Sequence, residues 1–493
     1  MEMKPQSMKK NFIFQILHQL VIFAMPLIVS PYLTRRLGDS SLGIYSYTYS
    51  IAYYFVVLGM MGISRHGQRI IAERRKNDIA LRKAFWSLYI VHIFFACIAF
   101  ATFIIFILMW GKDYQVIYLI QSIYVASALF DITFLFYGLE NFKSVVIRNF
   151  LVKILECILI FCFVKTPADL PVYTLIMSGS MLLGQLSMMP QALIILKPIR
   201  FGMSDIREHI VPLFTLFIAV ASSTLYTVFD KTLLGILTIT ENVAYYEYSN
   251  KIIAIPKNMI AVIDTVIFPY ACACVANDDK KNAYKYVNIA LHFTGLIGTG
   301  AIWGLFGVGN LLAVLYYGGN FAVCGDIIKA CSPLILIVTI GDIIRTQYLI
   351  PNHKDNLYII CLVLNALINL IFSIILIPYL GIYGAVIGTM AAEMFGLCFQ
   401  LYVSKKFITV KSVVYAIIPY NFFGIVMFIV IDIIRIHHNT TWGHLILQVL
   451  AGATVYLILS LFYLIKYSSV RNWTKKEFSC VLTYISKYLK PKI

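Results

Sequence analysis

The sequence has little charge. Charged residues make up 13% of the 493 residues, against roughly 25% in an average soluble protein, whereas hydrophobic residues make up 60% and the mean hydropathy is +0.83. A chain of this composition cannot cover a large surface with groups that water solvates. The sequence therefore excludes a set of soluble domains and predicts a protein whose main solvent is lipid.

Motifs for several kinds of soluble chemistry are also missing. There is no glycine-rich loop of the kind that binds the phosphates of ATP. The ten cysteines include no zinc or thioredoxin spacing, since Cys272 and Cys274 are separated by a single residue. The connections between hydrophobic runs are too short for an extramembrane domain. We therefore expect no cofactor, no metal site and no ATP-driven step.

Fourteen hydrophobic runs follow one another along the chain, each long enough to span a hydrocarbon core of ~30 Å as a helix. Helices satisfy their own backbone groups in lipid, and no ~10-residue alternating segments indicate a closed barrel. The sequence predicts an all-α integral membrane protein with 14 transmembrane helices, the first of them uncleaved. The approximate runs are 12–34, 42–63, 84–110, 115–138, 144–164, 171–196, 210–235, 243–273, 286–315, 327–350, 357–377, 382–402, 412–434 and 444–466.

The distribution of positive charge orients these helices. With the N-terminus inside, the inner segments hold 28 lysines and arginines and the outer segments hold 5. Cytoplasmic loops are enriched in these residues, so both termini are predicted to be cytoplasmic. The net charge of +17 then reflects the cytoplasmic surface and not a nucleic-acid site. Membrane lipids are expected partners, and the basic tail (467–493) should lie along anionic headgroups.

An internal repeat suggests the organisation of the bundle. Leu37-Gly38 precedes segment 43–51, and Leu234-Gly235 precedes segment 244–252; both segments read small-x-Tyr-x-Tyr-[Ser/Thr]-x-x-Ile. Chance similarity in a tyrosine-rich chain is the alternative. Six runs separate the copies, which predicts two six-helix lobes related by a pseudo-two-fold axis along the membrane normal, and alternating access by rocking. The predicted parts are an N-lobe (1–196), a cytoplasmic linker (197–209), a C-lobe (210–402), two C-terminal helices (403–466) and the basic cytoplasmic tail (467–493).

Ionisable residues inside the runs are candidate functional residues, because each costs ~2.5–3.5 kcal/mol on insertion scales. Three pairs at helical spacing could simply neutralise each other: Lys153 with Glu156, Asp342 with Arg345, and Glu247 with Lys251. Alternatively, the cations line an aqueous cleft and bind an anionic group such as a pyrophosphate. The candidate substrate-binding cations are Lys153, Lys231, Lys251 and Arg345. The carboxylates that could form ion pairs, or couple transport to H⁺ or Na⁺, are Asp131, Asp230, Asp264, Asp342 and Glu393.

Three stretches carry a family resemblance. The first runs from Leu37-Gly38 to Arg75, the second from Asp131 to Lys143 and on to Lys153, and the third from Asp230-Lys231 to Ile252. Residues 67–75, GQRIIAERR, are similar to a Gly-x-Arg-x-Ile-Ala-x-x-Arg element, and residues 131–143 to an Asp-x-x-Trp-x-Phe-x-Gly-x-Glu-x-Phe-Lys signature, with Phe134 in place of tryptophan. Asp230-Lys231 and the second repeat segment form the third stretch. From about residue 9 to 465 the chain resembles the polysaccharide flippase family of the multidrug/oligosaccharidyl-lipid/polysaccharide exporter superfamily. The motif residues are Gly67, Arg69, Arg75, Asp131, Gly138, Glu140 and Lys143.

The resemblance implies a flippase of a bacterial plasma membrane. Its substrate would be an undecaprenyl-pyrophosphate-linked oligosaccharide repeat unit, carried from the inner to the outer leaflet for capsule, O-antigen or exopolysaccharide synthesis. The family implies a monomer that associates with polysaccharide biosynthesis enzymes. A lipid II flippase and a cation-coupled multidrug exporter are alternatives within the superfamily.

A membrane polysaccharide polymerase or transferase is an alternative of another class. The outer loops are short, and the histidines of the last one (His437, His438 and His444) lack a carboxylate or cysteine beside them. The sequence therefore favours a transporter over an enzyme.

Overall fold

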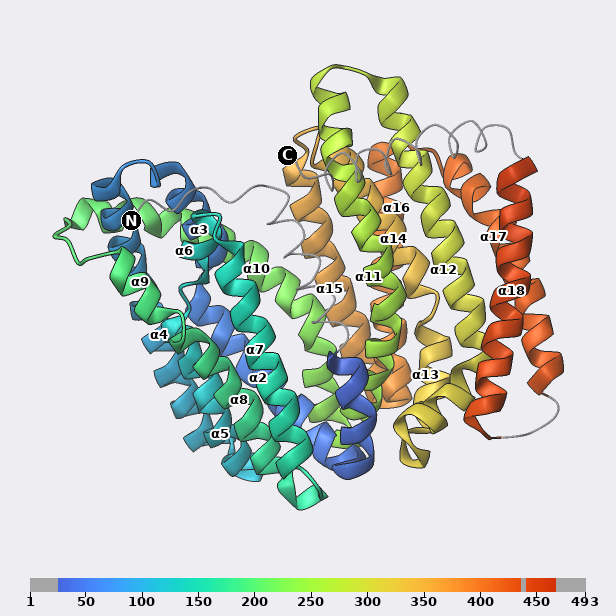
Figure 1. The fold of residues 1–493 in the computed structure, drawn as a ribbon, viewed down its shortest axis with the longest axis horizontal. Helices are drawn as coiled ribbons and strands as arrows, with labels where there is room; N and C mark the ends of the chain where they lie inside the picture. Colours follow the sequence, from blue (N-terminus) through green and yellow to red (C-terminus); the bar gives the residue numbers. More distant parts are fainter. Residues whose placement is uncertain (1–24, 436–439, 467–493) are drawn as a thin grey trace, which may run out of the picture. The chain divides into compact units, whose positions relative to one another are not determined.

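The computed structural model describes residues 25–435 and 440–466. Within these ranges the chain forms helices and turns and no strand (Figure 1). The first part of the first predicted span (12–24), His437 and His438, and the basic tail (467–493) lie outside the described residues. The described part of the first predicted span, residues 25–34, is helical, and this helix continues to residue 36.

The chain divides into two compact units, Met1–Ala244 and Tyr245–Ile493. The helices up to the boundary are α2 (Gly38–Met60), α3 (Ile63–Arg74), α4 (Asp78–Trp110), α5 (Gln115–Ser127), α6 (Thr133–Gly138), α7 (Phe142–Phe163), α8 (Leu170–Leu186), α9 (Met189–Ile195) and α10 (Met203–Leu237). Those that follow are α11 (Thr240–Ala276), α12 (Lys280–Tyr317), α13 (Val323–Cys331), α14 (Leu334–Ile344), the π-helical turn η5 (Arg345–Leu349), α15 (Asp355–Leu380), α16 (Ile382–Ser404), α17 (Val410–Arg435) and α18 (Trp442–Lys466).

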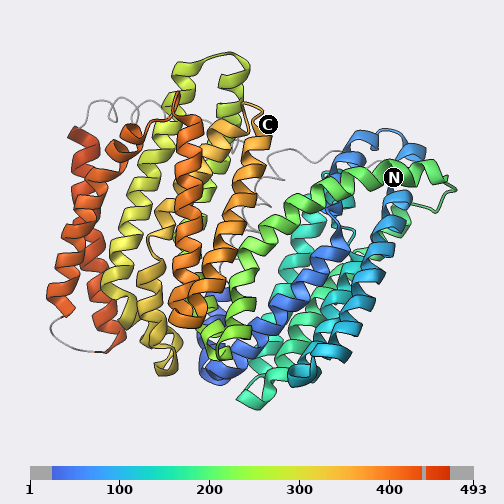
Figure 2. The same ribbon diagram turned by 180° about the vertical axis from the view of Figure 1, so that it is seen from behind.

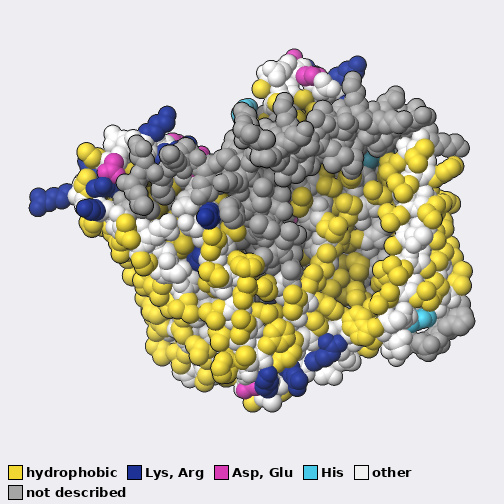
Figure 3. All heavy atoms as spheres, viewed as in Figure 1, with side chains coloured by type: hydrophobic (Ala, Val, Ile, Leu, Met, Phe, Trp, Pro, Cys, Tyr) yellow, Lys and Arg dark blue, Asp and Glu magenta, His cyan; other side chains and the backbone are white. Residues whose placement is uncertain are grey.

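Nine helices of the described residues are long and apolar enough to cross a membrane, or ten if the bent pair Gly319–Cys331 and Leu334–Leu349 forms one span. Their flanks carry mostly hydrophobic side chains (Figure 3). The predicted all-helical, multi-spanning class is confirmed. Each predicted run from 42–63 onward overlaps a helix. Helices α2 and α7 are not among these nine, because α2 is rich in serine and tyrosine and α7 carries several charged residues. The number of fourteen spans therefore stays a prediction.

α10 belongs to the first unit. It packs against α2, α3 and α4. Ser50 Oγ and Tyr54 OH each lie 3.0 Å from Thr232 Oγ1, and Gly235 lies against the ring of Tyr47. The compact division therefore falls after Ala244, whereas the predicted lobes (1–196 and 210–402) rest on the sequence repeat and stay a prediction.

The second unit is built from helices that run side by side (Figures 1 and 2). α12 packs on α17 and α15 packs on α16. Small residues let these helices approach closely, as in many membrane bundles. Gly307 lies against Ile431, and Gly424 lies against the indole of Trp303, which donates a hydrogen bond to Asn421 Oδ1 at 2.8 Å.

Candidate functional site

The first two motif stretches pack on each other in the first unit. An added Cβ at Gly67 on α3 would lie 2.5 Å from Cδ2 of Phe134 on α6, and one at Gly138 would lie 2.6 Å from Cβ of Ile71. Only glycine allows α3 and α6 to approach so closely. These two motif glycines therefore have a structural role, which is to lock α3 against α6.

An ion pair connects the ends of the same two stretches. Arg75 Nη1 lies 2.7 Å from Glu140 Oε1, and both side chains are partly exposed. Glu140 adopts a left-handed backbone conformation with φ of 58°, two residues after the end of α6. Arg69 lies 3.9 Å from Glu73 on an exposed face of α3. Ion pairs as exposed as these contribute little stability each. Arg69 and Arg75 therefore lie at the surface of the α3–α6 contact and add little to its stability.

Phe134, the position where the family often has tryptophan, lies inside the core of the first unit. Its side chain is 1% exposed and stacks on Phe85 at a centroid distance of 5.9 Å. This ring is covered by protein and cannot contact a sugar.

Asp131 ties three helices together. Its Oδ1 accepts hydrogen bonds from the backbone N–H and the hydroxyl of Thr133, at 2.9 and 2.6 Å, and so caps the start of α6. Its Oδ2 accepts from Gln185 Nε2 on α8 at 3.1 Å, and Gln185 Oε1 accepts from Arg148 on α7 at 3.0 Å. Since both carboxylate oxygens are bonded within the protein, the geometry gives Asp131 a positioning role.

Lys153 and Glu156 form an ion pair on α7. Lys153 Nζ lies 2.9 Å from both carboxylate oxygens of Glu156. The side chains are 29% and 11% exposed, respectively. The pair lowers the cost of placing two charges on a helix with apolar flanks, and the Lys153 side chain keeps partial exposure.

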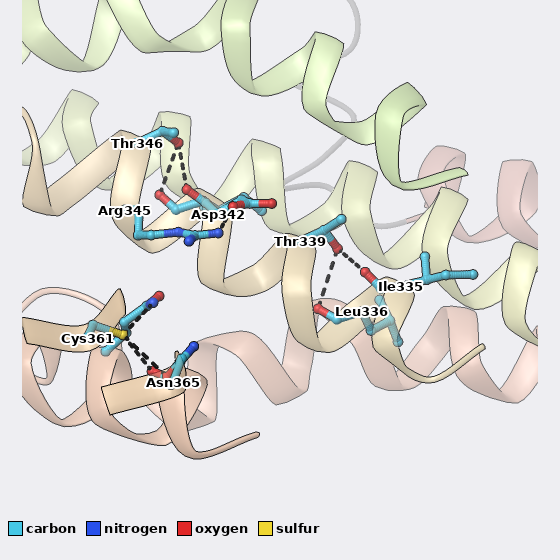
Figure 4. Close-up of polar contacts among 11 residues, drawn as sticks. Ile335, Leu336, Thr339, Asp342, Arg345, Thr346, Cys361 and Asn365 are labelled. Atoms are coloured by element: carbon cyan, nitrogen blue, oxygen red, sulfur yellow. Dashed lines mark hydrogen bonds and ion pairs between the residues drawn. The ribbon is translucent and has the colours of Figure 1, made fainter. Parts of the chain in front are cut away.

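Arg345 opens the π-helical turn of the second unit. Its guanidinium pairs with Asp342 one turn earlier, and Thr346 Oγ1 donates to the Asp342 carbonyl at 2.8 Å (Figure 4). The Arg345 side chain is 18% exposed, and its guanidinium carbon lies 6.0 Å from the ring centre of Tyr358. π-Helical turns are frequent at functional sites because they reorient side chains that a regular helix would direct elsewhere.

The third predicted pair is looser. Lys251 Nζ lies 3.8 Å from Glu247 Oε1 and 4.0 Å from the ring centre of Tyr248. Lys251 thus has a carboxylate and an aromatic face beside it. Such a cation–π contact contributes about 0.5–1 kcal/mol at exposed sites.

The remaining candidate carboxylates differ in burial. Asp230 is 3% exposed and Asp264 is 6% exposed. The backbone carbonyl of Asp264 accepts from Gln347 Nε2 at 3.3 Å, which joins α11 to the π-helical turn. Glu393 on α16 and Lys231 on α10 are half-buried. Their role in binding or coupling stays a prediction.

A stripe of buried polar residues runs along α15, and it was not predicted from the sequence. Cys361, Asn365, Asn369 and Ser373 recur every fourth residue and are all at most 5% exposed. Opposite them, α16 has Gly388 against Ser373 and Gly396 against Asn365. The sequence does contain a pattern that could have predicted this stripe. Polar residues stand at positions i, i+4 and i+8 of one apolar run, and small residues follow at the same spacing in the next run. Figure 4 shows Cys361 and Asn365 on this stripe.

Residues 8–273, more than half of the chain, match the family model of polysaccharide biosynthesis proteins. The chain belongs to this family. A protein of Shigella dysenteriae named as an O-antigen transporter is 25% identical over 406 residues, which cover 80% of this chain and 99% of that protein. A protein of Escherichia coli K12 with the same name is 20% identical over 394 residues, covering 78% and 94%.

Solved structures share the fold. The lipid II flippase MurJ in an inward closed conformation has a TM-score of 0.70 at 18% identity, covering 92% of this chain and 98% of that one. A MATE protein in complex with MaL6 has a TM-score of 0.52 at 12% identity, covering 81% and 94%. The chain is thus a multi-spanning polysaccharide biosynthesis protein that shares its fold with these structures, and together with the relatives named as O-antigen transporters this confirms the resemblance found in the sequence.

In this polysaccharide biosynthesis protein the four candidate cations are divided between the compact units. Lys153 and Lys231 belong to the first unit, and Lys251 and Arg345 belong to the second. A single cleft that gathers all four stays a prediction. What the geometry provides is local: Lys153, Lys251 and Arg345 each have a carboxylate one helical turn away.

Proposed function

We propose that the protein is a flippase for undecaprenyl-pyrophosphate-linked oligosaccharide repeat units. It would carry them from the inner to the outer leaflet of a bacterial plasma membrane, for capsule, O-antigen or exopolysaccharide synthesis. The family and the relatives named as O-antigen transporters support an oligosaccharide substrate. The observation that carries the proposal is the set of partly accessible cations on helices with apolar flanks, among them Lys153 on α7 and Arg345 on the π-helical turn.

The chemistry of these cations suits the substrate. An arginine or lysine binds phosphate oxygens by charge-assisted hydrogen bonds. A carboxylate one turn away competes with the phosphate, so that the bound pyrophosphate can be released again. The sugar crosses with the pyrophosphate while the polyprenyl chain stays in the bilayer.

The proposal includes the finer architecture predicted from the sequence. Fourteen spans form two six-helix lobes with a pseudo-two-fold axis along the membrane normal, followed by two further helices. Both termini are cytoplasmic, and the lobes alternate access by rocking. The protein works as a monomer and not as an enzyme, beside the enzymes that make the repeat unit. Coupling to H⁺ or Na⁺ would use the carboxylates, with Asp230 and Glu393 as the first candidates.

Complementation tests the proposal. The chain is expressed in a bacterial strain that lacks its polysaccharide flippase, and surface glycan is stained. We expect glycan to return, and to be lost again in Arg345→Ala and Lys153→Ala proteins that still insert in the membrane. Arg435→Ala is a matched control, because Arg435 also pairs with an aspartate three residues earlier, Asp432, but at the exposed end of α17.

Two results would contradict the proposal. Full glycan in both the Lys153 and Arg345 variants removes the role of the cations. No glycan from an inserted wild-type protein, across strains with different repeat units, removes the oligosaccharide substrate. Rescue of a strain that lacks its lipid II flippase would then favour lipid II, the substrate named for the structurally similar MurJ.

A further inference from the structure

A groove lies on the first unit between the beginning of α7 and the turn that joins α8 to α9. Its volume is about 560 Å³, within the roughly 300–1,000 Å³ typical of small-ligand sites. The side chains that line it include Lys143, Ser144, Ile147, Arg148, Leu151 and Gln191. All of them belong to one compact unit, so the groove is complete within it.

The groove lies on a different face of α7 from the Lys153–Glu156 pair. Ser144 and Lys153 are nine residues apart, which at 3.6 residues per turn places them about half a turn from each other. Ile147 is 41% exposed and Leu151 is 59% exposed, and the same apolar face continues along α7 with Leu155 and Ile158. The groove therefore opens on an exposed apolar flank of α7, which by the predicted topology faces lipid.

The polar end of the groove offers positive charge. The Arg148 guanidinium bonds to neutral acceptors, which are Asn149 Oδ1 at 2.7 Å, Gln185 Oε1 at 3.0 Å and the Gly184 carbonyl at 3.3 Å. Lys143 is exposed and has no ion-pair partner within the described chain. Among the described residues that line the groove none is acidic. Its lining thus carries two positive charges and no carboxylate. Asp131, which shares Gln185 with Arg148, offsets part of the charge of Arg148 from outside the lining, so Lys143 is the cation without a nearby acid in the described chain.

We propose that this groove binds the diphosphate head of a membrane lipid, with the lipid chain lying along Ile147 and Leu151. Lysine and arginine bind phosphate oxygens by charge-assisted hydrogen bonds, and the exposed apolar face beside them suits an alkyl or prenyl chain. A diphosphate carries more than one negative charge and so matches two cations better than the single charge of a phosphodiester lipid. The inference rests on the proposed function, since the lipid-linked substrate is the occupant.

The groove would be a docking site that the substrate reaches before the transport cations. By the predicted orientation Lys143 lies at the cytoplasmic end of α7, where the diphosphate of a lipid in the inner leaflet would be found. Binding there would hold the lipid against the protein while its sugar is still in the cytoplasm.

Lipid binding by the purified full-length protein tests the site. Undecaprenyl diphosphate is titrated into protein in nanodiscs of uncharged lipid, for the wild type and for Lys143→Gln and Arg148→Gln. Each lost charge-assisted bond should weaken binding about tenfold. Lys165→Gln, which alters an exposed lysine just beyond the other end of α7, should bind as the wild type does. Lys143 is exposed, so its replacement does not disturb folding even if Arg148→Gln does.

The other arms separate the sources of the phosphate and the two proposals. Inorganic pyrophosphate that competes as well as the lipid would show a site for a free anion, and phosphatidylglycerol that competes as well would show an ordinary anionic-lipid site. Either result, or unchanged affinity in the Lys143 variant, overturns the inference. The Lys143 effect should persist in a Lys153→Ala background. Binding needs no sugar and no transport, so glycan complementation can fail while this binding succeeds, and the reverse.

Discussion

Replacing Gly67 by alanine should destabilise the first unit, because α3 lies directly against the ring of Phe134. A Cβ at residue 67 would lie 2.5 Å from Phe134 Cδ2 and 2.8 Å from its Cγ. The ring is 1% exposed and packs against Phe85, so it cannot turn into solvent. Overpacking a core in this way costs about 1–3 kcal/mol. We expect a lower melting temperature for the Gly67→Ala protein purified in detergent, followed by intrinsic fluorescence.

A matched control and a double variant make this measurement decisive. Gly179 on α8 has no heavy atom within 4 Å of an added Cβ, so Gly179→Ala should be neutral or stabilising by about 0.4–1 kcal/mol. Phe134→Ala removes Cδ2 and Cγ, the two atoms that the new Cβ would meet first, and combining it with Gly67→Ala should cost less than the two single changes together. Equal melting temperatures for Gly67→Ala and Gly179→Ala would show that the close contact of α3 with α6 does not constrain the fold. The same conclusion follows if the loss of stability in the double variant equals the sum of the two single losses.

Two further predictions concern stability. His66, at the start of α3 and outside the predicted spans, lies 3.1 Å from His209, and burial followed by this neighbour lowers the pKa of His66 from 6.5 to about 4. The folded protein thus binds this proton less tightly than the unfolded chain, so stability is complete above about pH 6.5 and falls toward pH 4, by about 2 kcal/mol at pH 5. The melting temperature should follow this course, and His66→Gln should flatten it; an equally steep profile in the variant would contradict the assignment. Gly396→Ala should destabilise the second unit, because the new Cβ would lie 2.4 Å from the Asn365 amide, whereas Gly443→Ala, with no heavy atom within 4 Å, should not. Equal melting temperatures for these two variants would contradict close packing of α15 on α16.

The helical class and the position of each run from 42–63 onward were readable from the sequence, and Pro333 was a candidate kink, but the other breaks inside the runs were not readable. The run 115–138 is broken where the Asp131 side chain captures the N–H and hydroxyl of Thr133 and begins a new helix. The run 171–196 is broken before α9, which has Pro190 in its first turn, and the run 327–350 bends by 45° near Pro333. Hydrophobicity averages over such events, because a capping carboxylate or a proline changes the average of a long window very little.

Local spacing also predicted ion pairs better than it predicted long-range contacts. The pairs of Lys153 and Arg345 with the carboxylates three residues before or after them are formed, because a helix brings residues three apart onto one face. The contact of His66 with His209 joins residues 143 positions apart, and no periodicity contains that information. The same holds for α10, whose assignment to the first unit depends on side-chain packing against α2.

The motif residues and the candidate transport cations act through different physics, and this separates the phenotypes of their variants. Gly67, Gly138 and Asp131 have their space or their hydrogen bonds filled by the protein itself, so changing them alters packing and reduces the amount of folded protein. Lys153 and Arg345 retain partial exposure beside a carboxylate, so changing them should remove the proposed contact with an anion and leave the helices in place. Transport per folded molecule should therefore fall in the Lys153 and Arg345 variants and be preserved in the Gly67, Gly138 and Asp131 variants. Gly67, Gly138 and Asp131 of the family motifs thus build the scaffold, whereas the proposed transport role rests on the charges of Lys153 and Arg345.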